Sequence, residues 1–311
     1  MTAVYVDAGV GDEFRRQRLY AGDLFVYSPT PGSLELCELA RSLLREAFGG
    51  RDPETAQHAF PVARYAEILA ELKPRFIHHP RAKRGIRQLL GDLGCSLEQT
   101  FFDVPRLRTA TSDDYLSSGI AYAFHPHRDT WYSAPPFQLN WWIPVYEIQP
   151  DNCMAFHPRY WSVPLKNSSR EYDYYEWNAT CRREAARHVQ SDTRRQPRAE
   201  ESVDLDGDLR IVCRVGGIVL FSAAQLHSTV HNTSGRTRIS IDFRTVHLDD
   251  ARTRRGARNV DSACTGTTMR DYLRGTDLSR IPEEIVRRFD DGPTEGKELV
   301  YRPAASGEER P

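Results

Sequence analysis

The sequence has little net charge and few long apolar segments. In 311 residues, 42 Lys and Arg stand against 43 Asp and Glu. A chain with so small an excess of charge has no overall field that draws it to nucleic acid or to an anionic membrane. No apolar run reaches the length that crosses a bilayer. We therefore expect no nucleic-acid or membrane partner, while the oligomeric state stays open.

Export signals and close cysteine pairs are also missing. The stretch 1–13 is acidic and lacks the basic and apolar parts of a signal peptide. The 6 cysteines are far apart, with no pair at the spacing of a zinc or redox motif. We expect a cytoplasmic protein with reduced cysteines. Lysine is so scarce that nearly all positive charge is arginine, which we attribute to a GC-rich genome.

The N-terminal third has the periodicity of helices. Apolar residues at helical spacing predict helices over 32–49, 62–72 and 81–90. Ser33 is placed to cap the first helix and Gly49 to end it. Pro74 is placed to stop the second and Gly91 the third. This part of the chain is therefore expected to be mainly helical.

From about residue 101 the chain changes to short alternating segments separated by Pro, Gly, Asp and Asn, which is typical of an antiparallel sandwich or barrel. We expect an α+β fold, mainly β in its core, with the N-terminal helices packed on it. An aromatic and charged interval is expected to be an insertion that covers a site. The expected parts of one domain over 1–303 are helices (1–100), β core (101–250) with the insertion (166–201), a helical and loop part (251–303), and then a disordered tail (304–311).

One short segment concentrates His125, His127 and Asp129 at alternate positions. On an extended strand these side chains face the same way. Two histidines and a carboxylate form the facial triad that leaves three iron positions open for a cosubstrate and dioxygen. The distant histidine has two candidates, His227 and His231, after an apolar strand. We prefer His227 because it lies closer to the end of that strand.

Two alternating segments offer polar groups on one face. Arg238 and Ser240 place a forked cation and a hydroxyl on one side of a predicted strand, an arrangement suited to the far end of a dicarboxylate. An ordinary strand with a solvated charged face explains that segment equally well. In a second strand, the residues that share a face are Gln138, Asn140 and Trp142. This face lines either a cavity or solvent.

Together these segments resemble the phytanoyl-CoA dioxygenase branch of the iron(II)/2-oxoglutarate-dependent oxygenases. The resemblance covers about 122–246 and is carried by His127-Arg-Asp129, by Leu139 to His157-Pro158, and by Gly217-Ile-Val-Leu-Phe221 through His227 to Arg238. It implies a double-stranded β-helix, or jelly roll, with Fe(II) as cofactor and 2-oxoglutarate and O2 as cosubstrates. The metal ligands implied are His127, Asp129 and His227. Arg238 would pair with the C5 carboxylate of 2-oxoglutarate, and the neighbouring cofactor-binding residues would be Ser240, Gln138 and Asn140.

The resemblance also narrows the reaction. Members that halogenate replace the carboxylate ligand by Gly or Ala, so Asp129 favours hydroxylation, or a related desaturation or ring closure, of a small molecule. We expect a role in secondary metabolism such as antibiotic biosynthesis. The chain departs from the family at Gly216-Gly217, where a Gly-Asp is usual, and at His157-Pro-Arg-Tyr160, where a Pro-Gly-Ser-His turn is usual.

Two other interpretations remain at this point. His125-Pro-His127 is similar to the His-x-His of a cupin-type metal site, which would act without 2-oxoglutarate and leave Asp129 outside the metal. The second alternative is a jelly-roll binding module that has no catalytic activity. The candidates for substrate contact are Trp131, Tyr132, Trp142 and His125, although buried aromatic residues are more often part of a core.

Overall fold

The computed structural model describes residues 2–117, 125–181, 188, 192 and 194–290. The expected tail over 304–311 and the end of the C-terminal part lie outside these residues. Among the described residues no helix is long and apolar enough to span a membrane. All six cysteines are free.

The strands of the described residues form two sheets, a larger and a smaller one. The strands of the larger sheet are β1 (Val4–Val6), β2 (Leu24–Tyr27), β3 (Thr100–Phe102), β4 (Arg106–Ala110), β5 (Leu139–Pro144), β8 (Ile218–Ser222), β10 (Arg238–His247) and β11 (Leu273–Arg274). The smaller sheet contains β6 (Met154–Phe156), β7 (Leu209–Ile211) and β9 (His227–Thr229). The helices are α1 (Asp12–Tyr20), α2 (Pro31–Ala47), α3 (Val62–Ile77), α4 (Pro80–Asp92), α5 (Tyr174–Glu176), α6 (Leu248–Thr253) and α7 (Glu283–Val286).

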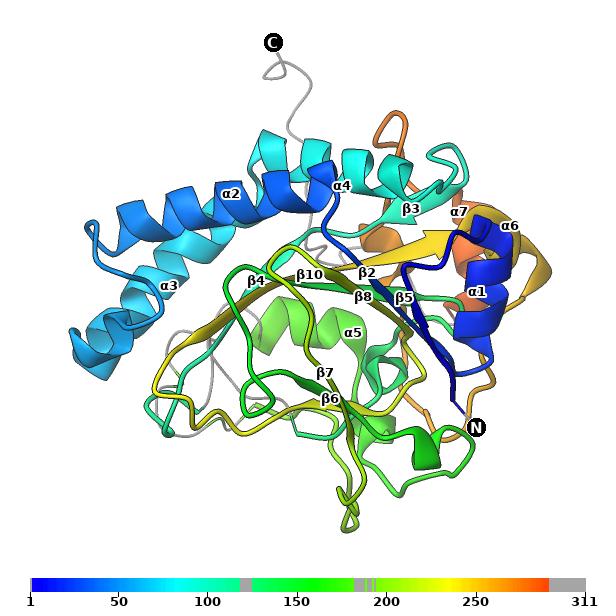
Figure 1. Ribbon diagram of the computed structural model, residues 1–311. Coiled ribbons are helices and arrows are strands. Elements are labelled where there is room, and N and C mark those ends of the chain that lie inside the picture. Colours follow the sequence, from blue (N-terminus) through cyan, green and yellow to red (C-terminus); the bar gives the residue numbers. More distant parts are fainter. Residues whose placement is uncertain (1, 118–124, 182–187, 189–191, 193, 291–311) are drawn as a thin grey trace.

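The larger sheet runs in the order β1-β2-β8-β5-β10-β3-β11, and β4 also pairs with β10. The smaller sheet runs β7-β6-β9. In Figure 1, α2, α3 and α4 cover one side of the larger sheet, and β6 and β7 lie on its other side. The mainly β core with helices packed on it agrees with the expected class.

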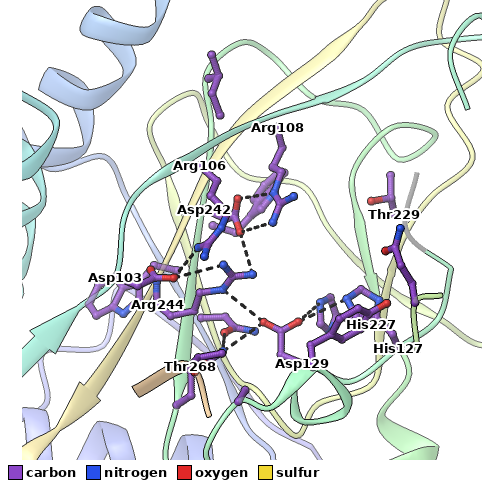
Figure 2. Close-up of a pocket in the computed structure, with 18 of the residues that line it drawn as sticks. Asp103, Arg106, Arg108, His127, Asp129, His227, Thr229, Asp242, Arg244 and Thr268 are labelled. Atoms are coloured by element: carbon purple, nitrogen blue, oxygen red, sulfur yellow. Dashed lines mark hydrogen bonds and ion pairs between the residues drawn. The ribbon is translucent and has the colours of Figure 1, made fainter. Parts of the chain in front are cut away.

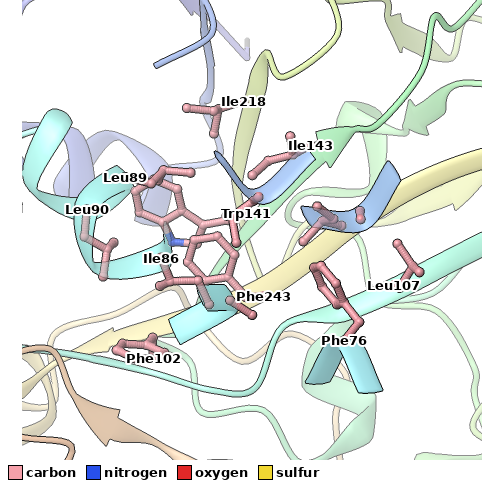
Figure 3. Close-up of a cluster of buried hydrophobic side chains, with 14 of the residues drawn as sticks. Phe76, Ile86, Leu89, Leu90, Phe102, Leu107, Trp141, Ile143, Ile218 and Phe243 are labelled. Atoms are coloured by element: carbon pink, nitrogen blue, oxygen red, sulfur yellow. The ribbon is translucent and has the colours of Figure 1, made fainter. Parts of the chain in front are cut away.

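The helices and the larger sheet enclose the main apolar core (Figure 3). Trp141 of β5 stacks on Phe243 of β10 with ring centroids 5.3 Å apart. Ile86 and Leu89 of α4 and Phe76 of α3 are buried in the same cluster. Each such side chain stabilises the fold by about 1.5–3 kcal/mol through its burial, so the face of the sheet toward the helices is fixed.

Strand β10 carries the predicted alternation. Its Ile239, Ile241 and Phe243 belong to the apolar core against the helices. The residues at the intervening positions, Arg238, Asp242 and Arg244, line a pocket. The charged face of this strand therefore points into the protein and not into solvent. Between the two sheets, side chains from both form a second buried apolar cluster, which includes Trp142, Val219, Phe221, Met154, Phe156 and Ile211.

Three helix boundaries differ from prediction. Pro74 lies inside α3, which continues to Ile77. Proline removes one backbone hydrogen bond, but only the last turn follows it, and burial of Phe76 offsets that loss. Helix α4 runs past Gly91 to Asp92, a difference within the usual uncertainty of helix ends.

The start of the first predicted helix is also different. Thr30 is the N-cap of α2, and its side chain accepts a hydrogen bond from the backbone of Ser33. Ser33 in turn accepts one from the backbone N–H of Thr30, 2.9 Å away. Pro31 occupies the first helical position, where its missing N–H is not needed. Ser33 therefore completes a capping box and is not the cap itself.

Candidate metal centre and pocket

Three side chains that are far apart in sequence meet at one point. His127 Nε2 lies 3.4 Å from Asp129 Oδ1, and His227 Nε2 lies 3.8 Å from the same oxygen. All three residues are buried, and their ligand atoms lie within 4.8 Å of one another. The two histidines are neighbours because their backbones form an antiparallel bridge, with both N···O distances 3.0 Å. This arrangement can hold a divalent metal from one side.

Hydrogen bonds fix which ring nitrogen of each histidine is available. His127 Nδ1 lies 2.8 Å from the carbonyl oxygen of His125, and His227 Nδ1 lies 2.9 Å from that of Gln225. A carbonyl only accepts, so Nδ1 is the donor in each neutral ring. Nε2 then keeps its lone pair and faces the site. Such donation to an outer partner is a regular feature of metal-ligating histidines.

The charges of the cluster suit a cation. Burial raises the pKa of the Asp129 carboxyl, but the proximity of His127 and the charge of Arg244 outweigh it and hold that pKa well below its usual range. Burial, followed by the proximity of His127, lowers the pKa of His227 to about 3. Near neutral pH the site therefore offers a carboxylate and, at His227, a neutral imidazole, the forms that bind a metal.

The second oxygen of Asp129 has partners of its own. Gln138 Nε2 donates a hydrogen bond to Asp129 Oδ2 at 3.3 Å, and Arg244 Nε lies 3.5 Å from the same oxygen. Gln138 is oriented by Tyr272, whose hydroxyl donates to its Oε1 at 2.7 Å. Oδ1 is thus left toward the histidines while Oδ2 is held from behind.

The prediction of one extended strand through His125, His127 and Asp129 is wrong. Asp129 begins a 3-10 helix, Asp129–Tyr132, and only His127 has a strand-like bridge. The first residues of that expected strand, 122–124, lie outside the described residues. His125 is exposed and absent from the pocket lining, so the histidine pair of a cupin-type site does not form. Alternation predicted the proximity of the ligands, but a turn produces it.

The two candidate distal histidines lie in different surroundings. His231 is exposed, with its Nε2 2.9 Å from Asp114 Oδ1 on the surface. His227 begins β9 and is buried at the triad.

Arg238 lies at another part of the same pocket. Its Nη1 donates to Ser240 Oγ at 2.8 Å, and its Nη2 donates to Thr229 Oγ1 at 3.2 Å. Its guanidinium also lies 5.6 Å from the centre of the Trp142 ring. Burial lowers the pKa of Arg238 to about 10. Among the described residues Arg238 has no carboxylate partner, and its Nε is buried without a hydrogen bond.

The pocket that joins these groups has a volume of about 510 Å³. Its lining includes Gln138, Asn140, Tyr132 and Trp142, so the polar face that includes Asn140 lines a cavity and not solvent. Trp131, a predicted substrate contact, does not line this pocket. It is fully buried in a separate apolar cluster, and its Nε1 donates to Asp261 Oδ1 at 2.7 Å. The expected insertion over 166–201 contributes Tyr172, Tyr174, Trp177, Asn178, Arg194 and Gln196 to the lining; its residues 182–187, 189–191 and 193 lie outside the described part.

A group of charged residues that was not singled out as a site lies beside the ligands (Figure 2). Arg244 contacts Asp103, Asp129 and Asp242. Arg108 Nε donates to Asp242 Oδ1 at 2.8 Å, and Arg106 pairs with Asp103. The alternation of Arg106 and Arg108 in a short strand was a usable signal, but only strand pairing shows that this strand lies next to β10.

No family model matches this sequence, and no curated protein matches it either. Similar solved structures include the apo form of ThoJ, a non-heme monooxygenase, with 14% identity over 71% of each chain and a TM-score of 0.36. The epimerase SnoN in complex with Fe3+, alpha ketoglutarate and nogalamycin RO shares 15% identity over 76% of this chain and 85% of its own, with a TM-score of 0.39. EvdO2 from Micromonospora carbonacea var. aurantiaca, complexed with 2-oxoglutarate, shares 16% identity over 56% and 62% of the two chains, with a TM-score of 0.34.

Each of the three TM-scores lies below 0.5. The functional assignment therefore rests on the side chains of this chain.

Proposed function

We propose that this protein is an iron(II)- and 2-oxoglutarate-dependent oxygenase. The observation that carries the proposal is Arg238, a buried guanidinium without a carboxylate partner among the described residues, which lines the same pocket as the metal triad. An isolated buried charge is costly unless a counter-ion joins it. A dicarboxylate that reaches from the triad to Arg238 supplies that counter-ion.

The residues present fit both groups. His127, Asp129 and His227 would hold Fe(II), with each imidazole fixed by its bond to a carbonyl. Arg238 and Ser240, together with Thr229, would bind the distal carboxylate through charge-assisted hydrogen bonds. Gln138, directly before β5, and Asn140 of β5 line the same pocket. We propose that the two sheets form a double-stranded β-helix around this space.

Iron(II) with 2-oxoglutarate and dioxygen supplies an oxidant able to attack a C–H bond, and the protein positions one substrate carbon against it. In the family that the sequence resembles, halogenating members lack the carboxylate ligand, and this chain has Asp129 at that position. We therefore propose hydroxylation, or a related desaturation or ring closure, of a small molecule, in secondary metabolism such as antibiotic biosynthesis.

The test of this function is the binding of 2-oxoglutarate to metal-loaded protein, measured anaerobically by isothermal titration calorimetry. Arg238→Gln should weaken binding by roughly 10- to 100-fold, because it removes a charged hydrogen-bonding partner from a buried site. Arg236→Gln is the matched control, because Arg236 is more than half exposed and pairs with Glu54. Equal affinities in the parent and Arg238→Gln would overturn the proposal.

A further inference from the structure

The pocket extends beyond the triad and Arg238 to a wall made by α3 and β4. Lys73 and Ile77 of α3 and Arg106 and Arg108 of β4 line this part. A volume of about 510 Å³ lies within the range of pockets that hold drug-sized ligands. With 2-oxoglutarate at Arg238, space remains along this wall for a second small molecule.

The wall is positively charged. Arg106, Arg108 and Arg244 share two carboxylates: Asp103 contacts Arg106 and Arg244, and Asp242 contacts Arg108 and Arg244. Figure 2 shows these five residues gathered on the side of Asp129 opposite the two histidines. Asp129 also contacts Arg244, but Asp129 is left out of the charge count because its carboxylate would bind the metal. Three cations and two anions leave one positive charge in excess.

Of these three arginines, we consider Arg106 the one that can bind a ligand in the pocket. Its Nη1 is held by Asp103 and by the carbonyl oxygen of Val104. Its Nε and Nη2 have no hydrogen-bond partner within the described part of the chain, and its side chain is 18% exposed where it lines the pocket. A guanidinium fixed at one nitrogen, with other N–H groups open, suits forked binding of an anionic oxygen group.

From these contacts we infer that the substrate carries a carboxylate or phosphate group that binds to Arg106, within the cationic wall of β4 and α3. This inference rests on the proposed function, because it places the substrate in the space beside the metal. In the antiparallel register Arg106 lies opposite Asp242, two residues from Arg244 along β10. The anionic group would therefore lie roughly 7 Å along the strand from the residue that contacts Asp129.

The aromatic residues of the pocket indicate the shape of the rest of the substrate. Trp142 and Trp177 line the same pocket, as does Tyr132. Flat aromatic side chains pack well against a ring or an unsaturated chain. The substrate class that fits is a small acid or phosphate ester with a planar apolar body.

The inference is tested by calorimetric titration of the full-length protein with three probes of similar shape: benzoate, phenyl phosphate and neutral benzamide. Titrations are made with metal-free protein and with protein loaded anaerobically with Fe(II) and 2-oxoglutarate. At least one anionic probe should bind about tenfold or more tightly than benzamide. The comparison of benzoate with phenyl phosphate tells whether the group is a carboxylate or a phosphate.

Two variants and a control locate the binding. Arg106→Gln should abolish the preference for the anion, and Arg106→Lys, which keeps the charge beside Asp103, should lose only part of it. The control is Arg75→Gln: Arg75 of α3 forms an exposed pair with Glu46 of α2, so this variant should behave as the parent. Thermal unfolding verifies that each variant is folded.

The outcomes separate this inference from the proposed function. Anion binding that depends on Arg106 and persists in Arg238→Gln supports the inference even if 2-oxoglutarate does not bind. Equal binding of anionic and neutral probes, or an anion preference that survives in Arg106→Gln, overturns it. Loss of the preference in Arg238→Gln alone also overturns it, because the probe would then occupy the 2-oxoglutarate position.

Discussion

Arg244 lies against Asp129, with its Nε 3.5 Å from Oδ2. Asp103 and Asp242 hold the guanidinium from the other side, so its position is fixed independently of any metal. The contact keeps Oδ2 turned away from the histidines. Asp129 is thus oriented to give a metal one oxygen, which leaves positions for other ligands.

Replacement of Arg244 should therefore weaken metal binding. We expect Arg244→Gln to lower the affinity for Fe(II) or Co(II) by roughly 10- to 100-fold, as for other outer partners of metal ligands. Anaerobic titration followed by equilibrium dialysis measures this. Arg16→Gln removes a comparably buried guanidinium from pairs with Asp12 and Asp250, outside the pocket. An equal loss in Arg16→Gln would mean that the effect is general destabilisation.

The two candidate distal histidines give a matched pair. His227→Ala removes a buried ligand and should abolish measurable metal binding. His231→Ala changes an exposed residue paired with Asp114 and should leave metal affinity within about twofold of the parent, as surface changes usually do. If both variants bind metal like the parent, the triad is wrong.

Lys73 predicts a pH dependence of stability. Burial, and then the charge of Arg108, lowers the pKa of Lys73 to about 7, from 10.5. Between these values the unfolded chain holds a proton that the folded chain lacks, so the free energy of unfolding rises as pH increases from about 7 to 10. Below pH 7 the desolvation penalty of the Lys73 cation is fully present.

Lys73→Met removes this penalty. We expect the variant to be about 1–3 kcal/mol more stable than the parent at pH 6, and the difference should shrink as pH approaches 10. Urea unfolding at several pH values measures both curves. A constant difference across this range would show that Lys73 does not titrate with a lowered pKa.

Trp131 and Trp142 should respond differently to the same substitution. Trp131→Phe leaves a cavity and removes a donor from Asp261, so we expect a loss of about 2–4 kcal/mol of stability with unchanged 2-oxoglutarate affinity. Trp142→Phe alters the ring beside Arg238 and should weaken 2-oxoglutarate instead. Chemical denaturation and calorimetry together separate the two effects.

The sequence was most informative where chemistry and periodicity coincide. His127, Asp129 and His227 are residue types that few structural roles require together, and the alternation of β10 placed Arg238 and Ser240 on one face. The turn that brings Asp129 to His127 depends on contacts between distant segments, such as the bridge from His127 to His227. Local periodicity cannot encode such a contact.

The charged wall shows the same limit. Arg106 and Arg108 lie beside Asp242 and Ser240 only because β4 pairs with β10 in one register, across more than 120 residues. Lys73 joins them because α3 packs on β4. Neither pairing follows from the segments themselves, so the residues that would recognise substrate became visible only in three dimensions.

The most direct test of the central claim is an anaerobic titration of the metal-free protein with Fe(II) and then 2-oxoglutarate, followed by visible absorption. The account predicts a weak metal-to-ligand band in the parent. The band should be absent in His127→Ala and should need far more 2-oxoglutarate in Arg238→Ala. Iron binding without any band on addition of 2-oxoglutarate would contradict the account, and the metal site would then serve another chemistry.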